Sequence, residues 1–470
     1  MLFNSFYFIF LFFPITIFVY FILNNYEHQK LAKFWLVLTS LYFYGYFNYS
    51  YLILIIASIV VNYSAGTWIT NKTAFKKEVF VLGILFNVLG LGYFKYYDFF
   101  IKNLNFILKT DLPILNILLP LGISFFTFQQ LSFLIDSYRG KSQNYDFLSY
   151  CLFVTFFPQL IAGPIVLPDE MLPQFETLNN KKVNYENINR GLYLFSIGLA
   201  KKVVLADSIS YLANLGFDTM PSLTFVEGWI TSISYTLQLY LDFSGYCDMA
   251  MGLALMFNII LPLNFNSPYK ALNIQDFWQR WHMTLGRFLT NYIYIPLGGN
   301  RKSELITLRN LLIVFLISGV WHGAGWTFIV WGAFHGIAIL IHRVWKNKNL
   351  FMPNFLAWLI TMFFVNIFWI FFRAQNFSSA IKVLKSMFDI GSLNELISAG
   401  YKELAQPYLG KKITLILIVL SIYIILFCKN SFEKQECFEL TTKNRIEKFI
   451  YFFLGLLLLN RVVPFLYFNF

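Results

Sequence analysis

Charged side chains are scarce in this 470-residue sequence, because Asp, Glu, Lys and Arg together make up only 13% of it. Soluble globular proteins carry about 25% charged residues, whereas hydrophobic residues here reach 58%. Such a chain has too few charged groups to cover a surface that faces water, which excludes soluble, disordered, coiled-coil and collagen-like proteins. The composition indicates an integral membrane protein.

Cysteines and the common hydrolytic or nucleotide-binding motifs are also few. The four cysteines form no Cys-x-x-Cys pair and are Cys151, Cys247, Cys428 and Cys437. Their spacing predicts neither a disulfide framework nor a zinc site. The sequence has no GxSxG nucleophile elbow, Walker A loop, HExxH helix or Rossmann glycine pattern. Serine hydrolysis, NTP-driven transport and zinc proteolysis are therefore unsupported, and we expect no metal and no bound cofactor.

Positive charge exceeds negative charge, with 36 Lys and Arg against 24 Asp and Glu and a net charge of +12. The basic residues form clusters between apolar runs, as the positive-inside rule describes, so membrane lipid rather than nucleic acid is the expected partner. The clusters predict an N-terminus outside, a cytoplasmic loop at 429–448, and a last helix at 449–461 that leads the chain outside. Those of the first half are Lys30 and Lys33, Lys72, Lys76 and Lys77, Arg139 and Lys141, and Lys181 and Lys182.

Apolar runs recur along the whole chain, and the first, at 2–23, is too long and aromatic for a cleaved signal peptide. Since a membrane helix needs about 20 apolar residues, the runs predict about 11–14 membrane segments. Proline and glycine interrupt them at 120–122, 158–164, 262–268 and 296–299. Such breaks are tolerated at membrane depth only inside protein or beside a wet cavity. We therefore predict an all-α polytopic membrane protein with re-entrant helices around a central funnel.

No repeat and no low-complexity linker divides the sequence, so we expect a single domain over residues 1–470. The longest stretch of mixed polarity, 373–411, predicts an interfacial amphipathic helix with loops.

Two of the five histidines stand in sequence contexts that suit catalysis. His322 lies between apolar runs, where an ionisable group is costly and usually faces a functional cavity, and a neutral imidazole can take a proton from a hydroxyl. The alternative is a core histidine packed between tryptophans. His282 lies in a segment that mixes charge with Trp, which fits either a helix at the headgroups or a second polar group that steers a donor or polarises its carbonyl. Their separation of 40 residues does not show that they meet.

The remaining histidines are less informative. His28 lies in a basic loop, where we expect it to be solvated, and His342 fits a helix end at the interface. His335 suits a packed helix and a cavity equally well.

Two carboxylates interrupt the apolar sequence around residue 245. Asp242 and Asp248 are six residues apart and do not share a helical face, so each needs its own partner or a wet cavity. Arg280 is a plausible partner, and a structural pairing is as compatible with the pattern as a catalytic role.

The chain ends on an aromatic segment, PFLYFNF at 464–470. It fits an interfacial anchor, or a terminus on which Tyr467 presents a hydroxyl beside the pore.

Six segments together resemble the membrane-bound O-acyltransferase (MBOAT) family, in particular its bacterial branch with the alginate O-acetylase and the peptidoglycan O-acetyltransferase. The resemblance covers nearly the whole chain, and the segments occur in the family's order. They are FPQLIAGPI (157–165), DFSGYCDMAMG (242–252), NFNSPY (264–269), DFWQRWHMTL (276–285), YIPLGGN (294–300) and GVWHGAGW (319–326).

The resemblance implies a catalytic core at about 110–345, with His322 as the catalytic histidine and His282 as the second active-site histidine. The motif residues Asp242, Asp248, Asn266 and Arg280 become candidates for substrate binding or for structural polar roles. The chain end at 449–470 becomes a membrane helix with an extracytoplasmic tail. That tail is similar to the end of the small membrane partner used in teichoic-acid D-alanylation, which makes Tyr467 the candidate acyl relay.

The expected activity is therefore that of an acyltransferase in the bacterial inner membrane. It would move acetyl groups from a cytoplasmic thioester, acetyl-CoA or an acyl carrier, towards an envelope polysaccharide such as peptidoglycan or alginate. A separate periplasmic acetyltransferase is the expected partner. The alternatives are D-alanyl transfer to teichoic acid, a small-solute transporter, for which the two matching halves are not found, and a non-catalytic scaffold for polysaccharide export.

Overall fold

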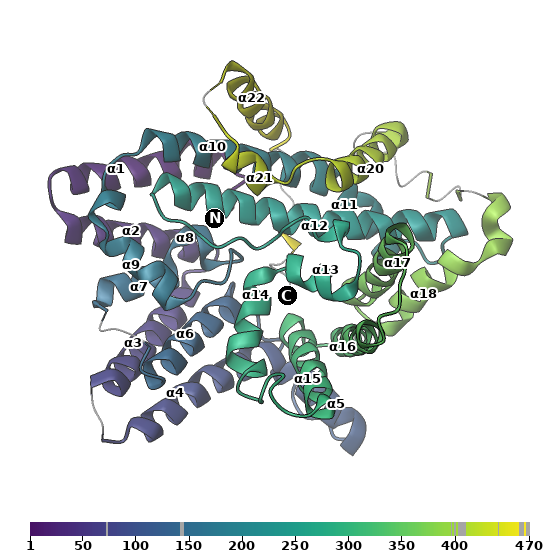
Figure 1. Ribbon diagram of the computed structural model, residues 1–470, viewed down its shortest axis with the longest axis horizontal. Helices are drawn as coiled ribbons and strands as arrows, with labels where there is room; N and C mark the ends of the chain where they lie inside the picture. The colour runs from purple at the N-terminus through teal and green to yellow at the C-terminus, as the bar shows by residue number, and fades with distance from the viewer. Residues whose placement is uncertain are drawn as a thin grey trace. The chain divides into compact units, whose positions relative to one another are not determined.

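The computed structural model describes residues 1–71, 74–141, 145–395, 397–398, 401–402, 410–439, 441–459 and 465–466, and its secondary structure there is helical (Figure 1). Six described helices are long and apolar enough to cross a membrane: Phe8–Asn25, Ser50–Asn71, Lys76–Leu108, Glu304–His322, Trp326–Asn347 and Asn354–Arg373. The prediction of an all-α polytopic membrane protein is confirmed. The number of further, shorter or re-entrant segments stays a prediction.

The described residues cluster into two compact units. The first comprises Met1–Ser196 and Cys247–Leu263, and the second comprises Ile197–Tyr246 and Asn264–Leu466. The prediction that the whole chain acts as a single domain stays a prediction.

The first unit is built mainly from α1 to α10. Their bounds are α1 Phe13–Asn25, α2 Gln29–Gly45, α3 Ser50–Asn71, α4 Lys76–Leu91, α5 Tyr97–Leu108, α6 Ile123–Tyr138, α7 Phe147–Thr155, α8 Phe157–Leu160, α9 Pro168–Glu176 and α10 Tyr185–Ala200. Within it, α3, α4 and α6 pack side by side (Figure 1).

The second unit holds the remaining helices, except that the end of α12 from Cys247 onwards belongs to the first unit. They are α11 Asp207–Asn214, α12 Phe225–Met256, α13 Ile274–Arg280, α14 Met283–Leu289, α15 Glu304–His322, α16 Trp326–Asn347, α17 Asn354–Arg373, α18 Phe377–Phe388, α20 Gly410–Phe427, α21 Ser431–Glu436 and α22 Thr442–Leu457. A π-helical segment, Lys201–Ala206, precedes α11.

The predicted interruptions all fall where helices end or begin. Residues 120–122 precede α6, 158–164 contain the one-turn helix α8 and the loop after it, 262–268 form the connection towards α13, and 296–299 form the turn before α15. The chain around residue 245, by contrast, is one continuous helix of 32 residues, α12.

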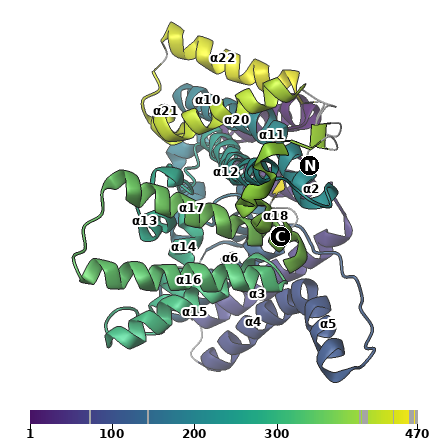
Figure 2. The same cartoon turned by 90° about the vertical axis from the view of Figure 1, so that its right-hand side faces the viewer.

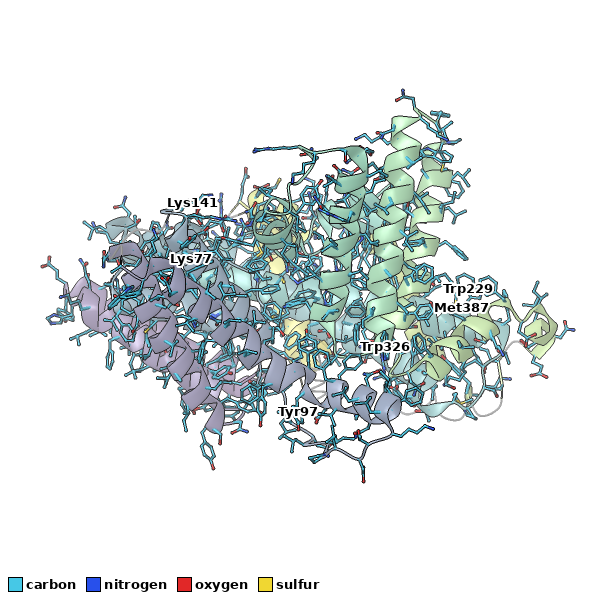
Figure 3. The ribbon with its side chains drawn as sticks, turned by 90° about the horizontal axis from the view of Figure 1, so that it is seen from below. Lys77, Tyr97, Lys141, Trp229, Trp326 and Met387 are labelled. Atoms are coloured by element: carbon cyan, nitrogen blue, oxygen red, sulfur yellow. The ribbon has the colours of Figure 1, made fainter. Side chains whose placement is uncertain are left out.

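Several predicted basic clusters gather at one end of the first unit. The ring of Phe80 near the start of α4 stacks on Tyr138 at the end of α6, with centroids 4.3 Å apart, so these helices are antiparallel. Lys77 and Lys141 lie at this same end (Figure 3). The ammonium group of Lys33 binds Asp146, just after that end of α6, at 3.2 Å. This grouping is the pattern that the positive-inside rule requires of one membrane face.

The chain between 373 and 411 begins as expected with a helix, α18. It packs against α17, and its end is tied to α12, because the indole of Trp229 donates to the carbonyl of Met387 at 3.1 Å (Figure 3). The last helix, α22, begins at Thr442 rather than 449, because Thr441 caps it by accepting a hydrogen bond from the Asn444 amide. Its first half therefore carries the charged residues of the basic loop, and its membrane crossing stays a prediction.

Helices α15 and α16 pack against each other, and α17 lies alongside α16 (Figure 2). Two glycines face each other where they cross, Gly319 on α15 and Gly332 on α16. A Cβ atom on Gly332 would lie 2.5 Å from the carbonyl oxygen of Phe315 and 3.1 Å from Cα of Gly319. Small residues let membrane helices approach until their backbones touch, which here brings the end of α15 against α16.

Replacing Gly332 with Ala should push these helices apart. We expect the free energy of unfolding to fall by about 1–3 kcal/mol, the usual cost of overpacking, measured as a lower melting temperature in detergent. The matched control is Gly90→Ala on α4, where a Cβ atom meets nothing within 4 Å. Equal melting temperatures for the two variants would contradict the proposed role of the glycine contact.

Candidate active site

His322 is the last residue of α15 and is almost completely buried. Its imidazole lies edge-on to Trp331 of α16 and Phe372 of α17, with ring centroids 5.1 Å away in both cases. The glycine contact between α15 and α16 makes this approach possible. His322 is thus held on three sides by helices of the second unit, in surroundings that exclude most water.

His282 lies outside the candidate spans, between α13 and α14, in a backbone conformation that is unusual for a side chain of its size. Its φ is 46°, in the left-handed region. Such residues are costly and often occur at functional sites. Two hydrogen bonds between backbone groups stabilise the bend: the amide of Met283 donates to the carbonyl of Asn264 at 2.9 Å, and the amide of Gly286 donates to the carbonyl of His282 at 3.1 Å.

The structure brings the two histidines together, which their spacing in the sequence did not show. The ring centroids of His282 and His322 are 6.5 Å apart. Trp321 lies beside both, 4.9 Å from His322 and 6.2 Å from His282, and Phe243 of α12 meets His282 edge-on at 5.0 Å. The pair therefore shares one aromatic environment rather than lying at separate places.

Asn264 determines which nitrogen of His282 carries the proton. Its side-chain oxygen Oδ1 accepts from the backbone amide of Thr284 at 3.3 Å and from the Thr284 hydroxyl at 2.8 Å. The same oxygen lies 3.0 Å from Nδ1 of His282, so Nδ1 must be the protonated nitrogen and Nε2 must carry the lone pair. Burial lowers the pKa of His282 to about 3, which keeps this ring neutral at neutral pH.

His335 belongs to the same cluster. The indole of Trp278 donates to its Nδ1 at 3.3 Å, and the ring lies 4.9 Å from Trp331. The side chain is fully buried. Of the two expectations for His335, the structure shows the packed helix.

The expected partnership between Arg280 and Asp242 is wrong. Arg280 pairs with Asp276, one helical turn earlier, at 2.6 Å. Asp242 instead pairs with Lys202 at 3.0 Å, and Lys202 also pairs with Asp207 at 2.7 Å. The sequence analysis did not single out Lys202, because this residue stands in an apolar run. The available signal was the two adjacent lysines, Lys201 and Lys202, a few residues before Asp207.

The other predicted polar residues have different surroundings. Asn266 accepts a hydrogen bond from the side chain of Asn430 at 3.1 Å and donates its backbone amide to the carbonyl of Arg280, which links the loop before α13 to the start of α21. Asp248 is buried on the part of α12 that belongs to the first unit. Tyr467 lies outside the described residues.

Comparison with known proteins identifies the family. The model of the membrane-bound O-acyltransferase family (MBOAT) matches residues 39–381. The chain is 52% identical to "Peptidoglycan O-acetyltransferase" of Helicobacter pylori, with 84% of this chain and 81% of that protein covered. It is 38% identical to "Probable alginate O-acetylase AlgI" of Pseudomonas aeruginosa, with 85% and 78% covered.

A more distant relative represents the D-alanyl branch. "Teichoic acid D-alanyltransferase" of Bacillus subtilis is 26% identical, with 53% of this chain and 67% of that protein covered. The extent and identity of the matches place this chain nearer to the O-acetylating proteins. It belongs to the membrane-bound O-acyltransferase family and is a multi-pass membrane acyltransferase.

Proposed function

We propose that this enzyme moves acetyl groups from a cytoplasmic thioester, acetyl-CoA or an acyl carrier, across the bacterial inner membrane for O-acetylation of peptidoglycan. The observation that carries the proposal is the pair of buried imidazoles, 6.5 Å apart, in an aromatic cluster that limits hydrolysis by water. Peptidoglycan is preferred as acceptor because the relative that bears its name shares 52% identity.

The proposed step is transfer of an acyl group from sulfur to oxygen. His322 takes the proton of a hydroxyl while that oxygen forms a bond to the thioester carbonyl carbon. The carbon–sulfur bond then breaks, and the leaving thiolate receives the proton from the His322 imidazolium. A positioned base of this kind contributes about 10²- to 10⁴-fold to the rate.

The tautomer of His282 limits which role this residue can have in the transfer step. With Nδ1–H donating to Asn264, its Nε2 accepts hydrogen bonds and does not donate them. His282 is therefore unsuited to polarising the thioester carbonyl, which needs a donor, and the proton of the incoming hydroxyl passes to His322 alone.

A periplasmic acetyltransferase would accept the acetyl group outside and form the final ester, with Tyr467 as the relay between them. D-alanyl transfer is less well supported, because the relative with that activity matches at 26% identity over about half of this chain. Membership of an acyltransferase family removes the transporter and scaffold alternatives.

The purified enzyme in lipid nanodiscs, given radiolabelled acetyl-CoA or acetylated acyl carrier, tests the activity. We expect release of the free thiol together with label on the protein or on an added glycan acceptor. A well-folded protein that consumes neither donor would refute the proposal.

His322→Ala should reduce acyl transfer by at least about 10²-fold, because the base is lost, while the protein stays folded by circular dichroism and gel filtration. The matched control is His342→Ala, a half-buried histidine near the end of α16, outside the cluster. A folded His322→Ala enzyme with the normal rate would remove His322 from the mechanism.

Asn264→Ala should lower kcat by about 10- to 100-fold, since His282 loses the acceptor that fixes its tautomer. Asn264→Asp keeps an oxygen acceptor at the same place, so it should recover most of the rate. Asn347→Ala, on the exposed end of α16, controls for the change of residue type. Equal kcat values for the Ala and Asp variants would show that Asn264 does not act through the His282 proton.

Tyr467→Phe should abolish delivery of acetyl groups to the outer side and leave donor binding unchanged, because only the accepting hydroxyl is removed. Delivery is measured as labelled glycan outside sealed vesicles, and binding as donor affinity. Full delivery by this variant would mean that the tail is an anchor and not a relay.

A further inference from the structure

The second unit also holds a buried cluster of one lysine and two aspartates. Lys202 lies on the π-helical segment Lys201–Ala206, Asp207 begins α11, and Asp242 lies on α12. The exposed fractions of their side chains are 1%, 4% and 3%. The lysine bridges both carboxylates, and a buried charge is tolerated only when other groups compensate for the lost water.

The approach of α12 to the end of α10 gives this cluster its geometry. A Cβ atom on Gly245 would lie 2.9 Å from the carbonyl oxygen of Gly198 and 3.3 Å from the backbone nitrogen of Lys202. The glycine thus lets α12 lie against the segment that carries Lys202. Asp242, one turn before Gly245, is brought within reach of the ammonium group.

The end of the chain completes the cluster. The backbone amide of Leu466 donates to Oδ2 of Asp242 at 2.9 Å, while the ammonium group of Lys202 contacts Oδ1. The same ammonium lies 4.6 Å above the ring of Phe465, which is almost completely buried and packs edge-on against Tyr246 at 4.4 Å. Two consecutive tail residues are therefore held by a hydrogen bond, a cation–π contact and an aromatic contact.

Asp242 and the residue after it on α12 connect these tail contacts to the histidine pair. Phe243, which follows Asp242, is the residue whose ring meets His282 at 5.0 Å. Leu466, in turn, directly precedes Tyr467 in the sequence. Asp242 therefore binds the tail at the residue just before Tyr467, the relay of the proposed function. Phe243, the neighbour of Asp242, contacts the histidine pair.

We propose that Lys202 and Asp242 form a docking site for the C-terminal tail, and that Asp242 is a positioning residue for acyl transfer to Tyr467. The docking of the tail is argued from the contacts described above. The positioning role of Asp242 also rests on the proposed function. The lysine contacts one oxygen of each carboxylate, and the tail amide donates to the second oxygen of Asp242.

The contact itself is tested by hydrogen–deuterium exchange of the purified enzyme, followed on C-terminal peptides by mass spectrometry. Asp242→Ala leaves Lys202 with one carboxylate, Asp207, so the variant should fold. We expect slow exchange at the Leu466 amide in the wild type, fast exchange in Asp242→Ala, and wild-type behaviour in the control Glu304→Gln, which alters an exposed ion pair with Arg343. Equal exchange in wild type and Asp242→Ala would overturn the docking site.

The positioning role is tested by the rate at which label from the acetyl donor appears on Tyr467. Hydrogen bonds to charged groups correspond to about a 10- to 100-fold change in a docking equilibrium, so Asp242→Ala should slow tail acetylation by about that factor with an unchanged KM for the donor. An unchanged rate would overturn the role even if docking is confirmed. Absence of label on wild-type Tyr467 would refute the relay in the proposed function, while the exchange measurement would still decide the docking.

A second pair of variants leaves the cluster untouched. Leu466→Pro removes the amide proton that Asp242 accepts, whereas Leu466→Ala keeps it. We expect the first to slow tail acetylation as Asp242→Ala does, and the second to match the wild type. Combining Leu466→Pro with Asp242→Ala should add no further loss, because both remove the same contact. Additive losses would show that Asp242 acts through another group and would overturn the proposal.

Discussion

Burial of ionisable side chains in an apolar protein is the constraint on which the chemistry of this enzyme depends. An imidazole or carboxylate that leaves water must be kept neutral or be matched by a partner. His282 meets this requirement as a neutral ring bonded to Asn264, and Asp242 meets it through Lys202 and the Leu466 amide. The same burial that makes these groups costly keeps most water away from them.

Close helix packing creates this burial at the histidine pair. The contact of Gly319 with Gly332 joins α15 to α16 at backbone distance, and the indole of Trp331 then covers His322. Phe372 fills the space on another side of His322 without adding a hydrogen-bonding group that would need a partner of its own. The strained backbone at His282 fits the same picture, because surrounding hydrogen bonds fix a conformation that the residue alone disfavours.

Composition and breaks in the apolar runs were sufficient to predict the fold class and the places where helices end. Both depend on local chemistry: too little charge for a water-facing surface, and prolines that remove helical hydrogen bonds. The ion-pair partners of the buried charged residues were not predictable, because they depend on which distant segments of the chain meet. Arg280 pairs with Asp276 in its own helix. Asp242 pairs with Lys202, which lies 40 residues earlier in the sequence. The convergence of His282 and His322 depends on the path of α13 to α15, which no spacing encodes.

Asp242 and its neighbour Phe243 connect the C-terminal tail to the histidine pair through one helix. The side chain of Asp242 fastens the tail, and the next residue, Phe243, packs against His282. Because α12 is a continuous helix through this region, a displacement of Asp242 would also move Phe243 and change its contact with the ring of His282. A relay tyrosine on a tail fixed in this way would lose little conformational entropy when it reacts. Coupling of this kind would link the docking of the tail to the surroundings of the buried histidine pair.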